Sequence, residues 1–212
     1  MSTNTTSVWR KKLKELEIVV VIPTYNNGKT LAAVIEEVCR YADDIIVVND
    51  GSTDDTANIL EQYPAIRTIT HPVNKGKGTA LKHGLSQAKK EGFRYAITID
   101  SDGQHFASDI PCFIEAIEKE PDTLLVGARN LASDNMPGKN TFANKFSNFW
   151  FRLETGLKLE DTQSGYRLYP LRKMDVQSCW YTAKYEFELE AIVFAAWGDV
   201  VVKNIPIHAV SY

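Results

Sequence analysis

The sequence predicts an α/β protein built on a mostly parallel, twisted β-sheet with helices on both faces. Strand-like and helix-like segments alternate through residue 130, the order expected when each parallel strand is followed by a crossover helix. The strand-like segments are continuous apolar runs rich in β-branched residues, which are typical of strands covered on both faces. The length of 212 residues indicates one domain with a single substantial core.

The elements of this sheet follow in a regular order. Apolar runs predict strands at Ile18–Ile22, Ile45–Val48, Ile66–Ile69, Tyr95–Ile99 and Leu124–Val126. Apolar residues at helical spacing predict helices at Leu31–Val38, Thr53–Gln62, Lys77–Lys90 and Asp109–Lys119. Ligands of such sheets bind beyond the carboxyl ends of the strands, so a site is expected at that edge.

The pattern changes after Arg129. We expect a polar loop at Asn130–Asn140, helices at Thr141–Leu153 and Glu186–Trp197, and a late strand at Val200–Ile205. This second half is predicted to extend the first sheet and to supply the other wall of a cleft.

Composition and spacing exclude several classes of function. The formal net charge of −3 gives no general attraction to nucleic acid, and no Walker, GxGxxG, GxSxG or HExxH pattern is present. Scattered cysteines and the lack of an N-terminal secretory signal predict a cytosolic protein. The basic stretch at residues 9–14 has two interpretations: a solvated helix start or contact with an anionic membrane.

Polar clusters follow the first, second and fourth predicted strands. The cluster after the fourth strand is the most informative. Asp100 and Asp102 flank Ser101 directly after that strand. With the Gln104 amide oxygen they offer hard oxygen ligands suited to Mg²⁺ or Mn²⁺, and such a cation neutralises a diphosphate. The alternative is a polar turn whose aspartates accept only from backbone amides.

Three further residues each have two interpretations. Asp50, in the NDGS segment, is either a turn residue or the acid that binds the base or ribose of a nucleotide. Lys77, in NKGKG, either contacts phosphates or belongs to a plain surface turn. Arg129, at another strand end, either binds a phosphate or forms an ion pair.

The segment DTQSGYR at residues 161–167 combines an acid, small residues and an arginine. Asp161 is a candidate general base or acceptor-orienting group, and Arg167 is a candidate bidentate phosphate ligand. The alternative is an ion pair between the two side chains.

Taken together, these segments resemble family 2 glycosyltransferases, and among them the dolichyl- or polyprenyl-phosphate mannose synthase branch. The resemblance extends from Ile18 to the end of the chain and depends on seven segments in order: VVVIPTYNN, VVNDGSTDDT, NKGKGTAL, ITIDSDGQH, VGARN, DTQSGYRLY and YEFELE. It implies one domain of GT-A fold, with an N-terminal extension at 1–17, a nucleotide-sugar-binding half at 18–130 and an acceptor-side half at 131–212.

The resemblance also implies roles for individual residues. The donor-binding set is Pro23, Tyr25, Asn27, Asp50, Lys77, Asp100, Ser101, Asp102 and Arg129. The metal set, for Mg²⁺ or Mn²⁺, is Asp100, Asp102 and Gln104. Arg167 matches a basic residue near the acceptor phosphate, and Asp161 is the candidate base, with Glu186 and Glu188 as alternatives.

The implied function is inverting transfer of a hexose from a GDP-mannose or UDP-glucose type donor to a polyprenyl or dolichyl phosphate. Such an enzyme is expected at the cytosolic face of a membrane, in peripheral contact with it. The alternatives are a glycan-elongating transferase with a sugar hydroxyl acceptor, which needs a base, and a non-catalytic nucleotide-sugar-binding domain. Because members of this branch continue into a basic Gly/Ser/Lys-rich loop beyond the point where this chain stops, we expect a piece of a longer protein.

Overall fold

A computed structural model describes residues 3–129, 162, 164–174 and 187–208 of the chain. Its centre is a seven-stranded sheet of order β3-β2-β1-β4-β6-β5-β7. The strands are β1 (Ile18–Thr24), β2 (Ile45–Asn49), β3 (Arg67–Thr70), β4 (Tyr95–Thr98), β5 (Leu124–Arg129), β6 (Arg167–Pro170) and β7 (Val202–Ile207). Strands β1 to β4 pair in parallel, as the alternating pattern predicted.

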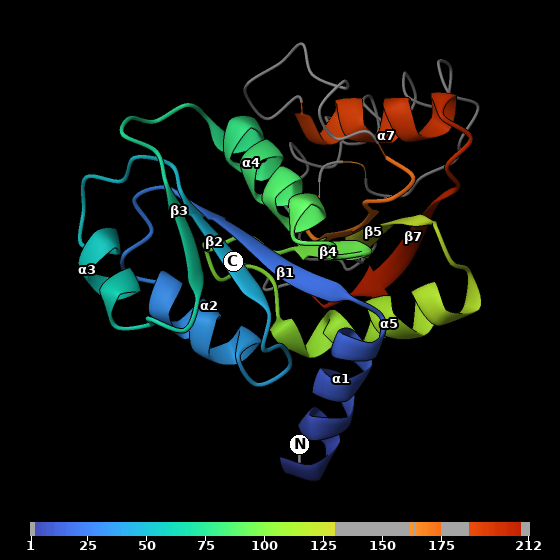
Figure 1. Cartoon of the computed structure of the whole chain (residues 1–212), viewed down its shortest axis with the longest axis horizontal. Helices are drawn as coiled ribbons and strands as arrows, with labels where there is room; N and C mark the ends of the chain where they lie inside the picture. Colours follow the sequence, from blue (N-terminus) through green and yellow to red (C-terminus); the bar gives the residue numbers. More distant parts are fainter. Residues whose placement is uncertain (1–2, 130–161, 163, 175–186, 209–212) are drawn as a thin grey trace, which may run out of the picture.

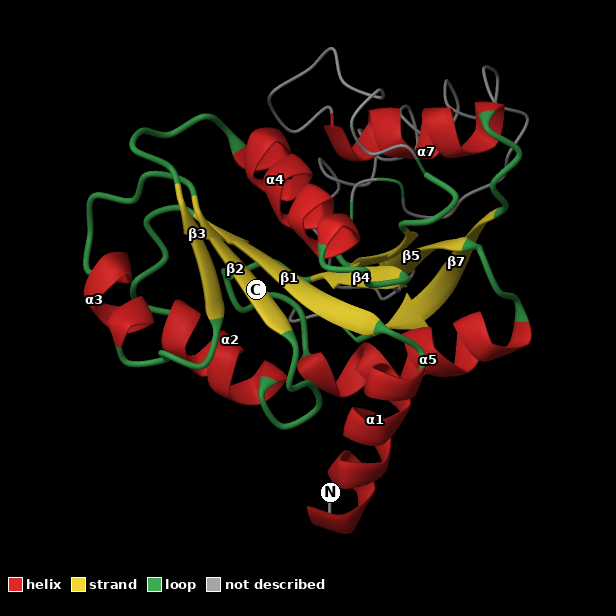
Figure 2. Cartoon of the chain, in the orientation of Figure 1, coloured by secondary structure: helices red, strands yellow, loops and turns green. Residues whose placement is uncertain are grey.

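Helices cover both faces of the sheet (Figures 1 and 2). On one face lie α4 (Lys77–Lys90) and α7 (Phe187–Trp197), and on the other lie α2 (Leu31–Val38), α3 (Thr56–Glu61), the short 3₁₀ helix η1 (Ala107–Asp109) and α5 (Ile110–Lys119). Strand β1 is buried along its whole length because its alternate side chains enter two different cores: Val20 and Ile22 pack towards α2 and α5, while Val19 and Val21 pack towards α4. The predicted fold class is therefore confirmed.

Strand β6 was not predicted. Its four residues pair antiparallel with β4 on one side and β5 on the other, so it is the one inverted strand in the described sheet. Through this pairing the chain just before Arg167 returns to the end of β4, where the Thr98 hydroxyl donates to the Gly165 carbonyl at 2.7 Å. A segment from the second half of the sequence thus closes on the carboxyl edge of the first.

The helix predicted at Thr53–Gln62 begins later, at Thr56. The Asp54 carboxylate accepts from the Thr56 amide at 3.1 Å and from the Gly28 amide at 2.9 Å, while the Thr53 amide donates to the Asn26 side chain at 2.8 Å. Residues 53–55 therefore form a turn that joins the β1–α2 and β2–α3 loops. The loop and helix expected between Asn130 and Leu153 lie outside the described residues.

Helix α1 (Thr3–Glu15) precedes β1 and projects from the body of the molecule at the edge opposite the carboxyl ends of the parallel strands (Figure 1). Two of its basic side chains pair with other parts of the chain: Arg10 with Asp43 at 3.1 Å, and Lys12 with Glu118 at 2.6 Å. These contacts hold two basic side chains of the stretch in partly exposed ion pairs with the protein itself.

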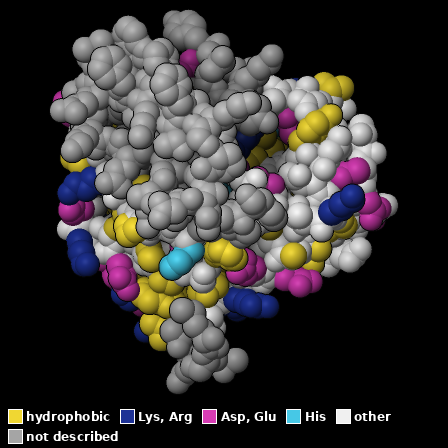
Figure 3. All heavy atoms as spheres, turned by 180° about the vertical axis from the view of Figure 1, so that it is seen from behind, with side chains coloured by type: hydrophobic (Ala, Val, Ile, Leu, Met, Phe, Trp, Pro, Cys, Tyr) yellow, Lys and Arg dark blue, Asp and Glu magenta, His cyan; other side chains and the backbone are white. Residues whose placement is uncertain are grey.

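The described surface mixes both signs of charge. In the view of Figure 3, Lys and Arg side chains lie beside Asp and Glu side chains. None of the described helices combines the length and the apolar character that a membrane crossing requires.

Candidate active site

A pocket of about 620 Å³ opens at the carboxyl edge of β1, β2 and β4. This volume lies within the range typical of small-molecule sites. The lining residues come from all three strand ends and from the start of α4: Pro23, Thr24, Tyr25, Asn27, Asp50, Asn74, Gly76, Lys77, Ala80, Asp100, Ser101 and Asp102. The structure thus brings together every predicted donor-binding residue except Arg129, whose side chain lies outside the described part of the protein.

The acidic turn after β4 is held in place by the loop after β1. The Thr30 hydroxyl donates to the Ser101 carbonyl at 2.6 Å, and the Asn27 side-chain amide donates to the Ser101 hydroxyl at 2.8 Å. Both bonds fix the residue between the two aspartates, so Asp100 and Asp102 face the same pocket.

The side chain of Gln104 does not lie in the pocket, where a metal ligand is expected. Its side chain is exposed and is not among the pocket-lining residues, while its backbone amide donates to Asp102 Oδ1 at 2.9 Å. Gln104 therefore shapes the turn, and Asp102 keeps its second carboxylate oxygen for the pocket.

Lys77 lies between two carboxylates. Its Nζ is 2.7 Å from Asp100 Oδ1 and 3.0 Å from Glu188 Oε1 at the start of α7. Burial alone would lower the pKa of Lys77, but the charges of Asp100 and Glu188 raise it above its ordinary value, so the ammonium group stays charged. Among the described residues that line the pocket, the carboxylates of Asp50, Asp100 and Asp102 outnumber the single cation Lys77, which makes the pocket attractive to further positive charge.

Gly165 lies so close to this ion pair that a larger residue would require Asp100 or Lys77 to move. A Cβ atom at this position would lie 2.5 Å from Asp100 Oδ2 and 2.8 Å from Lys77 Nζ. The segment around Gly165 therefore packs closely against Asp100, a contact that the sequence analysis did not predict.

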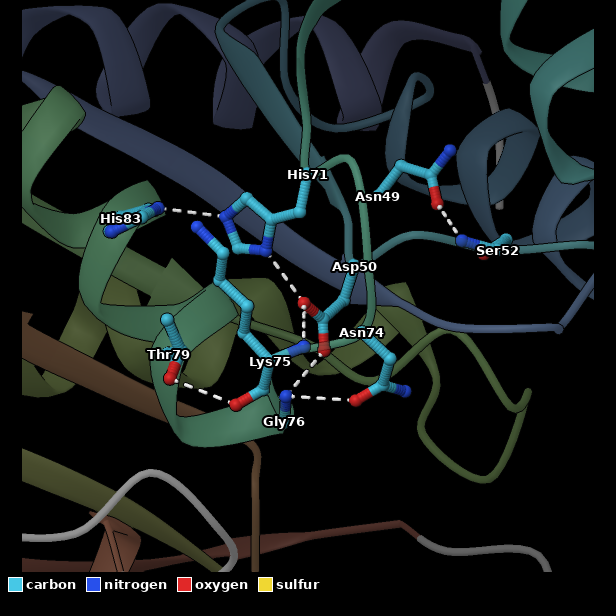
Figure 4. Close-up of polar contacts among 9 residues, drawn as sticks. All are labelled: Asn49, Asp50, Ser52, His71, Asn74, Lys75, Gly76, Thr79 and His83. Atoms are coloured by element: carbon cyan, nitrogen blue, oxygen red, sulfur yellow. Dashed lines mark hydrogen bonds and ion pairs between the residues drawn. The ribbon is translucent and has the colours of Figure 1, made fainter.

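Asp50 is buried at the end of β2 and lines the pocket. The turn role that Asp-Gly segments often have is taken by its neighbour, because Asn49 Oδ1 accepts from the Ser52 amide at 3.0 Å. The carboxylate of Asp50 instead holds the loop that leads into α4 by accepting from the amides of Lys75 and Gly76 (Figure 4). Gly51 permits this arrangement because its φ is +71° and a Cβ atom would lie 2.4 Å from the Val73 carbonyl carbon.

Arg167 requires a correction. We expected its guanidinium group at an acceptor phosphate, but the side chain is fully buried. It donates to the backbone carbonyls of Ser164 at 2.7 Å and Thr162 at 2.8 Å, and also to that of Glu188. Arg167 therefore joins the residue 162–165 segment to the start of α7, and it positions Glu188 without lining the pocket. Asp161 and Glu186 lie outside the described residues.

The pocket suits a divalent cation that is completed by a ligand. Asp100 and Asp102 supply carboxylate oxygens on one side, and Mg²⁺ typically combines one or two carboxylates with substrate phosphates. No three His, Cys, Asp or Glu side chains of the described residues form a complete metal cage. The position of the Lys77 ammonium beside Asp100 marks the place where positive charge is already favoured.

Sequence reasoning missed three residues that shape the pocket. His71 follows β3 at the same edge and contacts Asp50, Thr30 holds the acidic turn, and Glu188 pairs with Lys77. Glu188 was considered only as an alternative base. For His71 a usable signal was present, because it directly follows β3 and Asp50 directly follows the parallel neighbour β2.

Comparison with known proteins agrees with this geometry. The model of glycosyl transferase family 2 matches residues 19–176. The chain belongs to this family. A UDP-N-acetylglucosamine–dolichyl-phosphate N-acetylglucosaminyltransferase from Methanococcus voltae is 30% identical over 91% of this chain and 85% of the relative. A polyprenol monophosphomannose synthase from Mycolicibacterium smegmatis is 27% identical over 89% of this chain and 75% of the relative.

Solved structures of low sequence identity show the same fold. Glucosyl-3-phosphoglycerate synthase from Mycobacterium tuberculosis in complex with UDP superposes with a TM-score of 0.75 at 20% identity, covering 98% of this chain and 76% of that one. The same enzyme with Mn²⁺, UDP and glucosyl-3-phosphoglycerate gives 0.74, also at 20% identity, over 98% and 75% of the two chains. The GT-A fold of this family 2 glycosyltransferase is therefore established, and the resemblance drawn from the sequence motifs is confirmed.

Proposed function

We propose that this glycosyltransferase moves a hexose from a nucleoside-diphosphate sugar to a polyprenyl or dolichyl phosphate, with inversion at the anomeric carbon and with Mg²⁺ or Mn²⁺ at Asp100 and Asp102. The observation that carries the proposal is the convergence of Asp50, Lys77, Asp100 and Asp102 on one pocket. The names of the relatives support a lipid phosphate as acceptor, since they include transferases to dolichyl phosphate and a polyprenol monophosphomannose synthase.

Different pocket residues would contact different parts of the donor. Tyr25, with 44% of its surface exposed, offers an aromatic face for the nucleoside base. Asp50 accepts a hydrogen bond from the base or the ribose. The Lys77 ammonium, at the start of α4, lies where it can exchange its contact with Asp100 for one with a phosphate oxygen, because lysine binds phosphate as a mobile point charge.

Asp100 and Asp102 would hold the divalent cation. Such a cation neutralises the diphosphate and stabilises the charge that develops on it as it leaves. The bonds from Thr30 and Asn27 to Ser101 keep the two carboxylates in position before ligands bind, so little reorganisation is needed during the reaction.

The proposed acceptor needs little help from a base. A phosphate monoester has a second pKa of about 6, so its oxygen is already anionic near neutral pH. That oxygen attacks the anomeric carbon while the bond from this carbon to the diphosphate oxygen breaks, and the nucleoside diphosphate leaves. Since a polyprenyl chain resides in a bilayer, we place the protein in the cytoplasm, in peripheral contact with the inner face of a membrane.

The test measures sugar transfer to acceptors that differ in one group. Purified protein with Mn²⁺ receives radiolabelled UDP-glucose, UDP-N-acetylglucosamine or GDP-mannose, together with a short polyprenyl phosphate, the matching polyprenol or a soluble saccharide. We expect label in the organic phase with polyprenyl phosphate alone, accompanied by an equal amount of nucleoside diphosphate.

Two aspartate variants control for the site. Asp102→Asn should abolish transfer. Asp122→Asn should leave it unchanged, because Asp122 lies in a turn away from the pocket lining and forms a partly exposed ion pair with Arg94 at 3.5 Å. Transfer to the saccharide without transfer to polyprenyl phosphate would favour a glycan-elongating enzyme with Asp161 as base. Nucleotide binding without any product would favour a non-catalytic binding domain.

A further inference from the structure

The surroundings of Asp50 limit what its carboxylate can still bind. His71 Nδ1 lies 2.6 Å from Asp50 Oδ1, and the Lys75 amide donates to the same oxygen at 2.9 Å. The Gly76 amide donates to Oδ2 at 2.8 Å. A carboxylate offers about four acceptor positions, two on each oxygen. Oδ1 is therefore full, and Oδ2 has one position left.

The remaining acceptor position belongs to a residue that lines the pocket. Asp50 shares that lining with Tyr25 and Asn27 from the β1 loop and with Asn74 and Gly76 from the loop before α4. Figure 4 shows that His71 and the amides of Lys75 and Gly76 gather around the carboxylate. A ligand in the pocket therefore meets an acid that can accept one further hydrogen bond.

We propose that His71 is a specificity-determining residue of the donor pocket: by filling one acceptor position of Asp50, it leaves a place for a single base N–H and so selects a uracil-type base over guanine. This inference rests on the proposed function, because it assumes that the pocket holds a nucleoside diphosphate. It deepens that function by naming the class of nucleotide.

The chemistry of the base edges gives the reason. Uracil presents one ring N–H between two carbonyl groups, which one free position on Oδ2 satisfies. Guanine presents two adjacent donors, a ring N–H and an amino group, and a carboxylate receives them side by side only with a free position on each oxygen. With Oδ1 full, one guanine donor would find no acceptor on Asp50, and a donor that loses its water partner without gaining another weakens binding. Adenine and cytosine present a ring nitrogen acceptor there, which the carboxylate repels.

His71 is the one partner among the three donors to Asp50 that a substitution can remove, since the other two are backbone amides. Its side chain is buried, and its Nε2 lies 2.7 Å from His83 Nδ1. The two rings meet edge to face, with centroids 4.7 Å apart and an angle of 87° between their planes. His83 thus fixes the ring of His71 from the side away from Asp50.

The experiment compares the affinities of the protein for UDP and GDP by isothermal titration calorimetry in the presence of Mn²⁺. We expect the unmodified protein to bind UDP at least about tenfold more tightly than GDP, the effect of one unpaired buried donor. His71→Leu removes the N–H donor and opens Oδ1, so the ratio of the two affinities should fall towards one. His71→Asn places an amide N–H near the position of Nδ1 and should keep the preference for UDP.

Two controls separate selectivity from folding. His83→Ala leaves the contact between His71 and Asp50 in place and should keep most of the preference, and a thermal unfolding midpoint for each variant reports whether it folds. Should His71→Leu fail to fold, the lack of a UDP preference in the unmodified protein or in His71→Asn would still overturn the inference.

Several outcomes would overturn the inference. A preference for GDP, equal affinity for both nucleotides, or an unchanged ratio in a folded His71→Leu would each contradict it; the last would mean that Asp50 binds the ribose. Absence of binding to either nucleotide would overturn the proposed function as well. Selective UDP binding without transfer to polyprenyl phosphate would leave the inference standing and refute the proposed acceptor.

Discussion

Lys77 can be tested by removing its charge, because it is the cation between Asp100 and Glu188. The substitution Lys77→Met keeps the length and the apolar stem of the side chain and removes the ammonium group. The side chains of Lys77 and Asp100 are 21% and 20% exposed, and that of Glu188 is 7% exposed. Two carboxylates would then remain in a largely buried place without their counter-charge.

The size of the effect follows from these contacts. At the observed separations of 2.7 and 3.0 Å, each ion pair has a Coulomb energy of about 6 kcal/mol at an effective dielectric constant of about 20. Much of this is offset by desolvation, and breaking a buried pair typically costs about 3–5 kcal/mol. Because the side chains are partly exposed, we take the lower end of this range. We expect Lys77→Met to lower the free energy of unfolding by about 3 kcal/mol, which corresponds to about 6–12 °C in unfolding temperature for a chain of this size.

The assay is urea unfolding at neutral pH with and without Mn²⁺. Since no ammonium group competes for Asp100 in Lys77→Met, Mn²⁺ should raise the stability of this variant more than that of the unmodified protein. Lys90→Met, at the exposed end of the same helix, serves as the control and should lose no more than about 0.5 kcal/mol. A loss below about 1 kcal/mol in Lys77→Met, or an equal response to Mn²⁺ in both proteins, would refute the reasoning.

Two further substitutions test other parts of the structure. Gly165→Ala would place a methyl group 2.5 Å from Asp100 Oδ2, so cation-dependent UDP affinity measured by calorimetry should fall by about tenfold or more. Unchanged affinity would mean that the surrounding side chains move to accommodate the methyl group without disturbing the site. The hydrogen bond and charge of Asp109 raise the pKa of His208 in the folded protein. The contribution of this pair to the stability of the fold is therefore complete below the unfolded pKa of about 6.5, and it is lost as pH rises through the folded pKa. His208→Gln should therefore lower the unfolding temperature more at about pH 5.5 than at about pH 8.5, and an equal loss at both would contradict this.

The parallel part of the fold could be predicted from the sequence because each of its strands is a local signal. The run Ile18–Ile22 is continuous, apolar and β-branched, and it became the fully buried β1. Strand β6 carries no such signal. Its four residues include an arginine and a proline, and only antiparallel pairing with β4 and β5 makes them a strand.

The same distinction separates the site residues that sequence reasoning found from those that it missed. Asp50, Asp100 and Asp102 follow strands, so the rule that parallel strands end at one edge was enough to bring them together. Glu188 reaches Lys77 from α7 through tertiary contacts that no local pattern encodes. Arg167 was misplaced for a related reason: an arginine beside an acid suggests a phosphate ligand, whereas a buried guanidinium can also be satisfied by backbone carbonyls.

The central claim is that the acidic turn after β4 binds a divalent cation that in turn binds a diphosphate. Calorimetric titration of UDP into the protein, with Mn²⁺ and with chelator, tests it most directly, with Asp102→Asn as the matched variant. We predict that the protein binds UDP in the presence of Mn²⁺ and that chelator weakens this affinity by at least about tenfold. Asp102→Asn should show only the weak UDP binding that does not depend on the cation. Equal UDP affinity with and without Mn²⁺ in the unmodified protein would contradict the claim.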